Sequence, residues 1–532
     1  MLPSSHHSFI PFSTFCQART NPLRRTAVSH WSNVLAAGIA LALASGGLGA
    51  AATNDGPVAR TEAGRVAGLV QSQSVTFYNI PYAAPPTGER RWRPPAAPAR
   101  WRGVRDASTP GPSCPQQVPG NGRPNLGGVT SGTDEDCLQV TVFAPKRARR
   151  APVMVWIHGG SHRTGAGWVT SGASFARDGV VLVGVNYRLG PLGTFAHPAL
   201  TAEAGGSGPT GNYGLMDQIA ALRWVRRNIA AFGGDPDNVT LFGESAGGVS
   251  VQFLMAQPET RGLFHKVVIQ SGAGWYRPQD LAEKSARGVE IARAVGLEQA
   301  TAAQLRGVPA DLLIAKACCE FTPFQDGRMV TRTPTQAFAA GGMPDVPLII
   351  GWNSGEDVLM SPSRPNLATK VTPEIRAAYP EEAAAGETVL ARANFSDRIM
   401  GAPARWVAAR ASSGKPSWLY YFTYVAGRFR PRPTAWHADE IDFVFDGFDQ
   451  WVPPGSVSEE DRAKAAQTHS CWVAFAKSGI PHCDGGPAWP AYHPTSDQLL
   501  EIGRENRVVT NFRKPQLDAQ ERLSLPELLA PR

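Results

Sequence analysis

Ser245 stands in a run suited to a nucleophilic hydroxyl, Gly243-Glu244-Ser245-Ala246-Gly247. A serine hydroxyl is a weak nucleophile, so hydrolases hold it on a sharp turn between a strand and a helix, where a base and a carbonyl can both reach it. The flanking glycines permit such a turn because they lack a Cβ atom. The β-prone run 239–242 and the apolar run 249–255 predict the strand and the helix. The pattern indicates acyl transfer at Ser245; the alternative is a glycine-rich turn with an incidental serine.

A serine nucleophile needs a base, and the base needs an acid that orients it. In the fold that uses this turn, the chain order is serine, acid, histidine. Glu356 fits the acid because it follows the predicted strand 346–350 directly, and catalytic groups gather at the carboxyl ends of parallel strands. The neighbouring Asp357 is its competitor, and a solvated acidic turn is the alternative to both.

His437 fits the base, since it lies in the loop after the predicted strand 418–425. Other histidines also come late enough in the chain, but they occupy a predicted terminal helix and polar tail segments, where surface histidines are expected. These rivals are His469, His482 and His493.

A second glycine turn follows the predicted strand 153–157, in the run His158-Gly159-Gly160-Ser161-His162. It is similar to the loop that supplies backbone donors to a developing oxyanion. The N–H groups of Gly160, Ser161 and Ala246 are therefore the predicted oxyanion hole. An ordinary glycine-rich turn with a structural histidine remains the alternative.

Strand-like and helix-like segments alternate along the chain. An amphipathic helix is predicted at 215–229, ended by Gly233-Gly234. Such alternation predicts an α/β fold with a mainly parallel central sheet and helices on both faces. Irregular structure and small antiparallel strands are expected at 64–105. The predicted core strands are 153–157, 180–185, 239–242, 266–269, 346–350 and 418–425.

Residues 1–52 have the order of a secretory signal: arginines, an apolar run at 34–44, then small residues. The apolar run is short for a bilayer span, so we expect removal and export to the periplasm or the exterior, with an uncleaved anchor as the weaker reading. Its removal leaves 49 basic and 44 acidic residues, a net charge of +5 instead of +8. The basic residues are scattered, which does not favour nucleic-acid binding.

Six cysteines remain after that removal, and none has metal-ligand spacing with histidines. In an exported chain they predict disulfides. Cys114 and Cys137 are the expected pair because they flank a loop rich in Gly, Pro and Asn. Cys471 and Cys483 are a plausible second pair. The adjacent cysteines at 318 and 319 have no predicted partner.

Together these motifs resemble type-B carboxylesterases, an α/β-hydrolase family. The resemblance covers about 64–489 and includes the runs 135–138, 186–190, 211–218, 228–236 and 270–272 beside the serine motif. It implies one catalytic domain over 53–532, the triad Ser245, Glu356 and His437, a small-molecule ester as substrate, and neither metal nor cofactor. The sequence indicates no oligomeric state.

Two departures from the family pattern bear on the substrate. Ser161 replaces the third glycine of the oxyanion loop, and His162 and Arg163 follow it. Guanidinium groups pair with carboxylates, so these two residues suggest contact with a polycarboxylate ester, as in the fumonisin-type esterases that release tricarballylate. A general short-chain carboxylesterase is the main alternative, and a non-catalytic binding module on the same fold is the alternative from another class. The absence of a tryptophan between Cys114 and Cys137 disfavours a choline ester.

Overall fold

The computed structural model describes residues 56–205, 208, 210–275, 279–317, 320–360, 369–448, 452 and 455–530. The predicted signal at 1–52 lies outside the described residues, as do Cys318 and Cys319. Among the described residues, no helix is both long and apolar enough to cross a bilayer.

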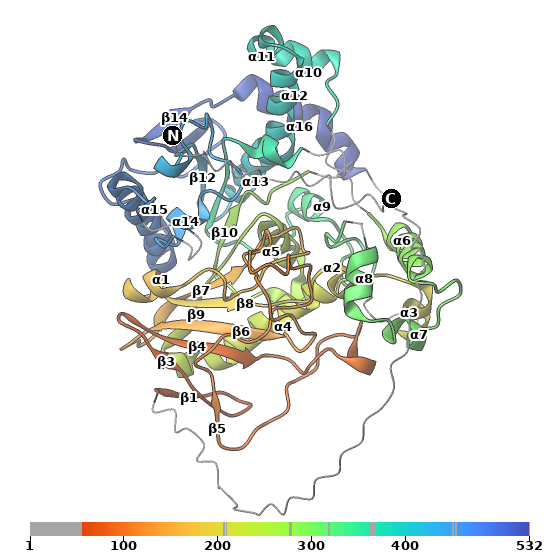
Figure 1. The fold of residues 1–532 in the computed structure, drawn as a ribbon. Helices are drawn as coiled ribbons and strands as arrows, with labels where there is room; N and C mark the ends of the chain where they lie inside the picture. Colours follow the sequence, from red (N-terminus) through yellow and green to blue (C-terminus); the bar gives the residue numbers. More distant parts are fainter. Residues whose placement is uncertain are drawn as a thin grey trace, which may run out of the picture.

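An eleven-stranded sheet forms the centre of the fold (Figure 1). The strands from β8 to β13 in its spatial order are parallel, while β14 at one edge and β6, β4 and β3 at the other are antiparallel. The α/β class with a mainly parallel sheet is therefore confirmed. In spatial order the strands are β14 (Asn506–Thr510), β13 (Gln498–Ile502), β12 (Ser417–Phe422), β11 (Leu348–Asn353), β10 (Lys266–Gln270), β9 (Gly234–Glu244), β7 (Ala151–Ile157), β8 (Val181–Val185), β6 (Gln139–Pro145), β4 (Ser74–Pro81) and β3 (Leu69–Val70).

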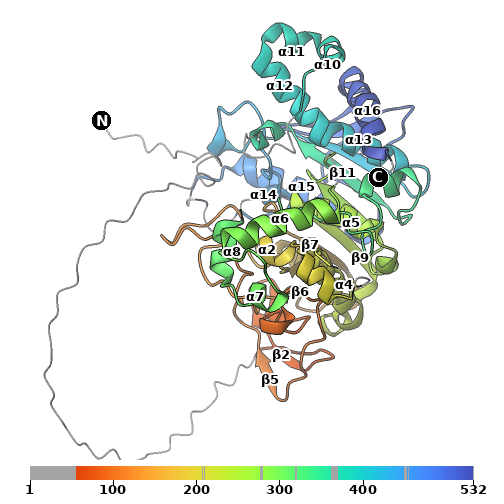
Figure 2. The ribbon, with the colours of Figure 1, turned by 90° about the vertical axis from the view of Figure 1, so that its right-hand side faces the viewer.

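The parallel strands are apolar on both faces because helices cover both. One core packs Met154 and Trp156 of β7 against Trp472 and Phe475 of a long helix near the C-terminus. The other core lies on the opposite face and contains Val155 of β7, Leu222 of α4 (Tyr213–Asn228) and Leu254 of α5 (Ala246–Ala256). Figure 2 shows these two helices on that face. Strands buried on both sides carry continuous Val, Ile and Leu runs rather than alternating patterns.

The helices are short except for α4, α6, α15 and α16. In chain order they are α1 (Ala173–Arg177), α2 (Gly190–Gly193), α3 (Pro198–Glu203), α4 (Tyr213–Asn228), α5 (Ala246–Ala256), α6 (Leu281–Ala294), α7 (Ala302–Arg306), α8 (Ala310–Lys316), α9 (Pro334–Ala339), α10 (Pro373–Ala378), α11 (Pro380–Ala385), α12 (Glu387–Ser396), α13 (Ala402–Ala411), α14 (Ile441–Val444), α15 (Glu459–Ser478) and α16 (Lys514–Leu529).

Several element boundaries differ from the sequence prediction, and two of these differences have a local reason. The helix predicted at 215–229 is α4 followed by a 3-10 turn, Ile229–Phe232, which ends at Gly233 with φ 80°. β11 begins at Leu348, two residues after the predicted start, because Pro347 has no N–H for the strand ladder.

A small second sheet lies at the N-terminal end of the described chain. It contains β1 (Val58–Arg60), β2 (Arg65–Ala67) and β5 (Val104–Asp106). β1, which precedes the region where small antiparallel strands were expected, is antiparallel to β2, whereas β2 and β5, at the two ends of that region, are parallel to each other. A strand pair separated by so many residues cannot be read from local turns.

Candidate active site

Ser245 lies between β9 and α5, at the carboxyl end of the sheet. Its backbone has φ 54° and ψ −123°, a conformation that a non-glycine residue rarely adopts. A Cβ atom at Gly247 would lie 1.9 Å from the Ile157 carbonyl oxygen, and one at Gly243 would lie 2.6 Å from the Gly247 carbonyl carbon. The glycines are needed because the turn packs its backbone directly against neighbouring backbone.

His437 bridges Ser245 and Glu356. Its Nε2 atom lies 2.7 Å from Ser245 Oγ, and its Nδ1 atom lies 2.6 Å from Glu356 Oε2. Glu356 is fully buried, directly after β11, whereas 11% of the His437 side chain is exposed. The competing acid Asp357 faces Arg392 instead, at 3.6 Å. The structure thus places the three residues predicted as a triad within hydrogen-bonding distance.

The loop that carries His437 is held by hydrogen bonds on both sides. Gly355 N donates to Ala435 O, and Asp439 Oδ2 accepts from Trp436 N at 2.8 Å. Arg432 pairs with the same carboxylate and stacks over the Trp436 ring at 4.3 Å. These contacts fix the backbone on both sides of the histidine.

Two further carboxyl groups lie buried beside the histidine, and sequence reasoning gave them no role. Glu244 Oε1 lies 3.1 Å from His437 Nε2, and Glu440 accepts hydrogen bonds from Asn353 and Gln270 at 2.5 and 3.1 Å. Burial raises the pKa of Glu244 to about 8 and that of Glu440 to about 7. The sequence did offer a signal for them, since Glu244 directly precedes the predicted nucleophile and Glu440 follows the predicted base by three residues.

The carboxyl groups control the charge of the imidazole. Burial lowers the pKa of His437, but the Glu356 and Glu244 carboxylates outweigh that effect and raise it to about 9. Negative charges within a few ångströms stabilise the imidazolium. Since His437 and Glu244 are in contact, they titrate as a coupled pair.

The predicted oxyanion loop lies against the nucleophile. A Cβ atom at Gly159 would lie 2.4 Å from Glu244 Oε2 and 3.1 Å from the Ser245 Cβ. Gly160 and Ser161 have φ values of 93° and 59°. Successive residues with left-handed backbone turn the loop sharply at the end of β7, beside the start of α5, where Ala246 lies.

The two residues predicted to contact substrate occupy different environments. His162 is 6% exposed, and its Nε2 atom lies 3.0 Å from Ser250 Oγ in α5. Burial lowers its pKa to about 3. This placement argues against direct substrate contact by His162 and in favour of a packing role. Arg163 is partly exposed, donates to Ala317 O at 3.4 Å and lies 5.6 Å from the Phe321 ring centre.

Among the described residues, no hydrogen bond joins a rival histidine to Ser245. The expectation that His469 lies on the surface is wrong: it is 1% exposed, its Nδ1 atom lies 2.8 Å from Val444 O, and its Nε2 atom lies 3.1 Å from Asp178. It is buried because α15 packs this side against the sheet core. His482 and His493 are exposed.

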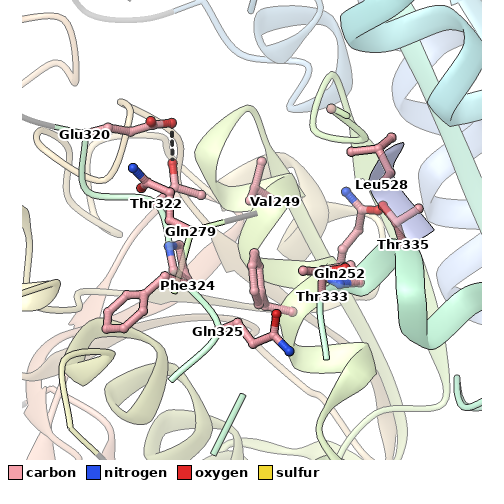
Figure 3. Close-up of a pocket in the computed structure, with 14 residues that line it drawn as sticks. Val249, Gln252, Gln279, Glu320, Thr322, Phe324, Gln325, Thr333, Thr335 and Leu528 are labelled. Carbon is pink, nitrogen blue, oxygen red and sulfur yellow. Dashed lines mark hydrogen bonds between the residues drawn. The ribbon is translucent and has the colours of Figure 1, made fainter. Parts of the chain in front are cut away.

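A pocket opens along α5, one turn beyond Ser245 (Figure 3). Val249, Gln252 and Phe253 of α5 form one wall, and the Thr322 hydroxyl donates to Glu320 on the other at 3.1 Å. Apart from Glu320, the described residues that line it are uncharged. The wall offers hydroxyl and amide groups as hydrogen-bonding partners.

Two disulfides are present in the described part of the chain. Cys114 is joined to Cys137, as predicted, and Cys471 of α15 is joined to Cys483. The first closes a loop that lies beside the oxyanion turn, because Gln116 within it accepts from Gly165 N at 2.8 Å.

Comparisons with known proteins identify the family of the chain. The carboxylesterase family model matches residues 55–520. The fumonisin B1 esterase of Sphingopyxis macrogoltabida is 36% identical over 483 residues, which covers 83% of this chain and 86% of that protein. The para-nitrobenzyl esterase of Bacillus subtilis (strain 168) is 33% identical over 493 residues, covering 88% and 98%. A solved structure of a PNB esterase has a TM-score of 0.74 at 32% identity, covering 87% of this chain and 99% of that one. The chain therefore belongs to the carboxylesterase family, and its activity is carboxylic ester hydrolysis.

Proposed function

We propose that the chain hydrolyses esters through an acyl-enzyme on Ser245. His437 takes the hydroxyl proton as Ser245 attacks the ester carbonyl, and then donates that proton to the leaving alcohol. In the second half, His437 takes a proton from water as the water attacks the acyl carbon, and returns that proton to Ser245 Oγ as the bond from Oγ to the acyl carbon breaks and the acid is released. Glu356 holds the imidazole by its Nδ1–H and stabilises the imidazolium. The observation that carries this proposal is the continuous contact from Ser245 Oγ through His437 to Glu356.

The oxyanion of the tetrahedral intermediate is assigned to the N–H groups of Gly160, Ser161 and Ala246. The support is the packing of the 159–161 turn against Ser245. The loss of one such donor typically costs about 3 to 4 kcal/mol of barrier.

Labelling with a fluorophosphonate probe tests the nucleophile directly. The wild-type chain should be labelled once, with loss of ester hydrolysis, and Ser245→Ala should be neither labelled nor active. Ser250→Ala, one turn further along α5, is the matched control and should still be labelled. A labelled and active Ser245→Ala variant would refute the mechanism and favour another nucleophile, while an unlabelled wild type would favour a binding module.

For the substrate we propose an ester whose acid part carries further carboxylates, of the tricarballylate type. Arg163 follows the oxyanion loop, and no carboxylate of the described residues lies within ion-pairing distance of it. An unpaired guanidinium at this edge is suited to a bidentate carboxylate. The similarity to a protein named fumonisin B1 esterase is in keeping with this class.

A second arginine supports the same substrate class. Arg398 donates to Trp275 O at 2.7 Å and lies over the Trp275 ring, and no described carboxylate lies within ion-pairing distance of it. Burial lowers its pKa to about 10. Trp275 follows β10 by five residues, and the segment between them lies against the nucleophile, since a Cβ atom at Gly272 would lie 2.8 Å from Ser245 O.

A pair of esters with the same alcohol distinguishes the two substrate classes. A tricarballylate monoester should be hydrolysed faster than a butyrate ester at low salt, and the advantage should shrink as salt rises. Arg163→Gln should remove most of that advantage, while Lys316→Gln, an exposed cation nearby, should leave it intact. Equal rates for both esters at all salt concentrations would favour the general short-chain carboxylesterase, for which the similarity to a para-nitrobenzyl esterase speaks.

We also propose that residues 1–52 direct export and are then removed. Two disulfides are in keeping with an oxidising compartment, since cytosolic thiols are kept reduced. N-terminal sequencing of the protein recovered from the periplasm or medium should begin near residue 53. Full-length chain retained in the cytosol would contradict export.

A further inference from the structure

The outer face of the small sheet combines arginines with apolar side chains. Arg60 of β1 is paired with Arg65 of β2, and Arg65 is paired with Val104 of β5. Directly paired residues of neighbouring strands project from the same face, and like charges in that position are destabilising. No carboxylate of the described residues lies within ion-pairing distance of Arg60 or Arg65. Among the described residues, no ion pair compensates this pair of like charges.

Two neighbouring segments extend this cationic surface, which we call the basic face and define as residues 58–70, 100–106 and 146–149. These segments carry eight cations and two acids. Of the acids, Glu62 is already paired with Arg227 at 2.8 Å. Seven exposed cations extend this surface: Arg60, Arg65, Arg100, Arg102, Lys146, Arg147 and Arg149. The eighth, Arg105, is paired with the buried Val66 and donates to Asn79, so it projects from the other side of the small sheet.

Hydrogen bonds and packing bring the three segments together. Trp101 Nε1 donates to Arg65 O at 2.8 Å, which joins the first two. Glu62 N donates to Asn228 Oδ1 at 2.8 Å, at the end of α4. The 3-10 turn after α4 leads to Gly233, where a Cβ atom would lie 2.5 Å from the Ala148 Cβ. Segment 146–149 is therefore connected to segment 58–70 through the 3-10 turn that follows α4.

Exposed apolar side chains occupy the same face. Val58 is 53% exposed and Val104 is 44% exposed, and both belong to the small sheet. Leu69 and Val70 of β3, 40% and 54% exposed, follow β2 after Gly68 alone. Val58 lies two residues before Arg60 in β1 and Val104 is paired with Arg65, so Val58 and Val104 project from the face that carries the two arginines.

The basic face lies away from the active-site edge. Segment 146–149 precedes β7 and Asn228 precedes β9, so the face lies at the amino ends of strands whose carboxyl ends carry Gly160 and Ser245. The seven residues of β7 span about 20 Å at about 3.3 Å per residue. Figures 1 and 2 show β1, β2 and β5 at the end of the molecule away from α10 to α12. A surface bound here would leave Ser245 accessible.

We propose that the basic face docks the protein on an anionic phospholipid membrane. Arginine and lysine side chains would lie among the lipid phosphates, and Val58 and Val104 would enter the boundary between headgroups and acyl chains. Interfacial binding depends on this combination of electrostatic attraction and buried apolar area. It is reversible and weakens with salt, and it holds the esterase at a surface without a spanning segment.

Sedimentation with vesicles tests this proposal on the chain from residue 53 onward. The protein should sediment with vesicles of phosphatidylcholine and phosphatidylglycerol, but not with phosphatidylcholine alone, and 0.5 M salt should release it. The variant Arg60→Gln/Arg65→Gln/Arg102→Gln should bind on the order of 100-fold more weakly, at roughly a factor of five per cation. Lys415→Gln/Lys477→Gln/Arg522→Gln, with the same charge change elsewhere on the surface, should bind like the wild type.

The apolar contribution is tested separately with Val58→Ser/Val104→Ser, which should weaken binding to anionic vesicles without changing its salt dependence. Hydrolysis of a soluble nitrophenyl ester, unchanged in all variants, shows that they are folded. Absence of vesicle binding, equal loss in both charge variants, or retention by a DNA duplex in place of vesicles would overturn the proposal. So would a dimer in solution that the Val58→Ser/Val104→Ser variant dissociates, because the face would then be a contact between copies of the chain.

Discussion

Replacement of Glu356 by glutamine tests the proposed triad through a conflict between two hydrogen bonds. Glu356 Oε2 accepts from His437 Nδ1, and its Oε1 accepts from the Asn353 backbone N–H at 2.9 Å. A glutamine has one acceptor oxygen for these two donors. If the oxygen serves Asn353, its NH2 group faces Nδ1 and moves the imidazole proton to Nε2, against the Ser245 hydroxyl. The imidazole then cannot act as the base.

The expected loss in kcat for Glu356→Gln is about 10⁴-fold, the size associated with a wrong imidazole tautomer in a serine hydrolase. This corresponds to about 5.4 kcal/mol of barrier, at about 1.36 kcal/mol per tenfold change. Fully buried surroundings leave no solvent to supply the missing acceptor. The assay is kcat for a nitrophenyl ester, with the melting temperature as a check on folding.

Asp357→Asn is the matched control. Asp357 is the adjacent acid but faces Arg392, so its variant should keep activity within about threefold of the wild type. A Glu356→Gln enzyme that retains more than a tenth of wild-type kcat, or an Asp357→Asn enzyme that loses as much as Glu356→Gln, would refute the assignment of Glu356.

Three further predictions follow from contacts outside the triad. Glu244→Gln removes a carboxylate 3.1 Å from His437 Nε2 and so lowers the His437 pKa from about 9. Because the neutral imidazole is the active form, the acid limb of the kcat/KM profile should move to lower pH by about one unit. A shift to higher pH would contradict this prediction. Arg432→Gln loosens the loop of His437, so kcat should fall about tenfold with little change in KM, whereas a change in KM alone would indicate a substrate contact. Cys114→Ser/Cys137→Ser opens a 23-residue loop and should lower the free energy of unfolding by about 3 kcal/mol in urea titration; an unchanged midpoint would contradict it.

Several features of this protein are determined by residues that are close together in the sequence. The glycines around Ser245, the apolar runs of the parallel strands and the position of Glu356 after one of them are local patterns, and local backbone sterics and burial enforce them. They were sufficient to predict the α/β class, to select three residues that the structure places in hydrogen-bonding contact, and to predict one disulfide.

Tertiary structure alone decided which side chains meet across long separations. The contact of Glu244 with His437 spans 193 positions, and only the packing of β9 beside the histidine loop creates it. The same holds for the burial of His162 and His469, which were expected at a substrate site and on the surface, respectively. Burial and pKa depend on everything that packs around a residue, whereas a sequence motif describes only its neighbours along the chain.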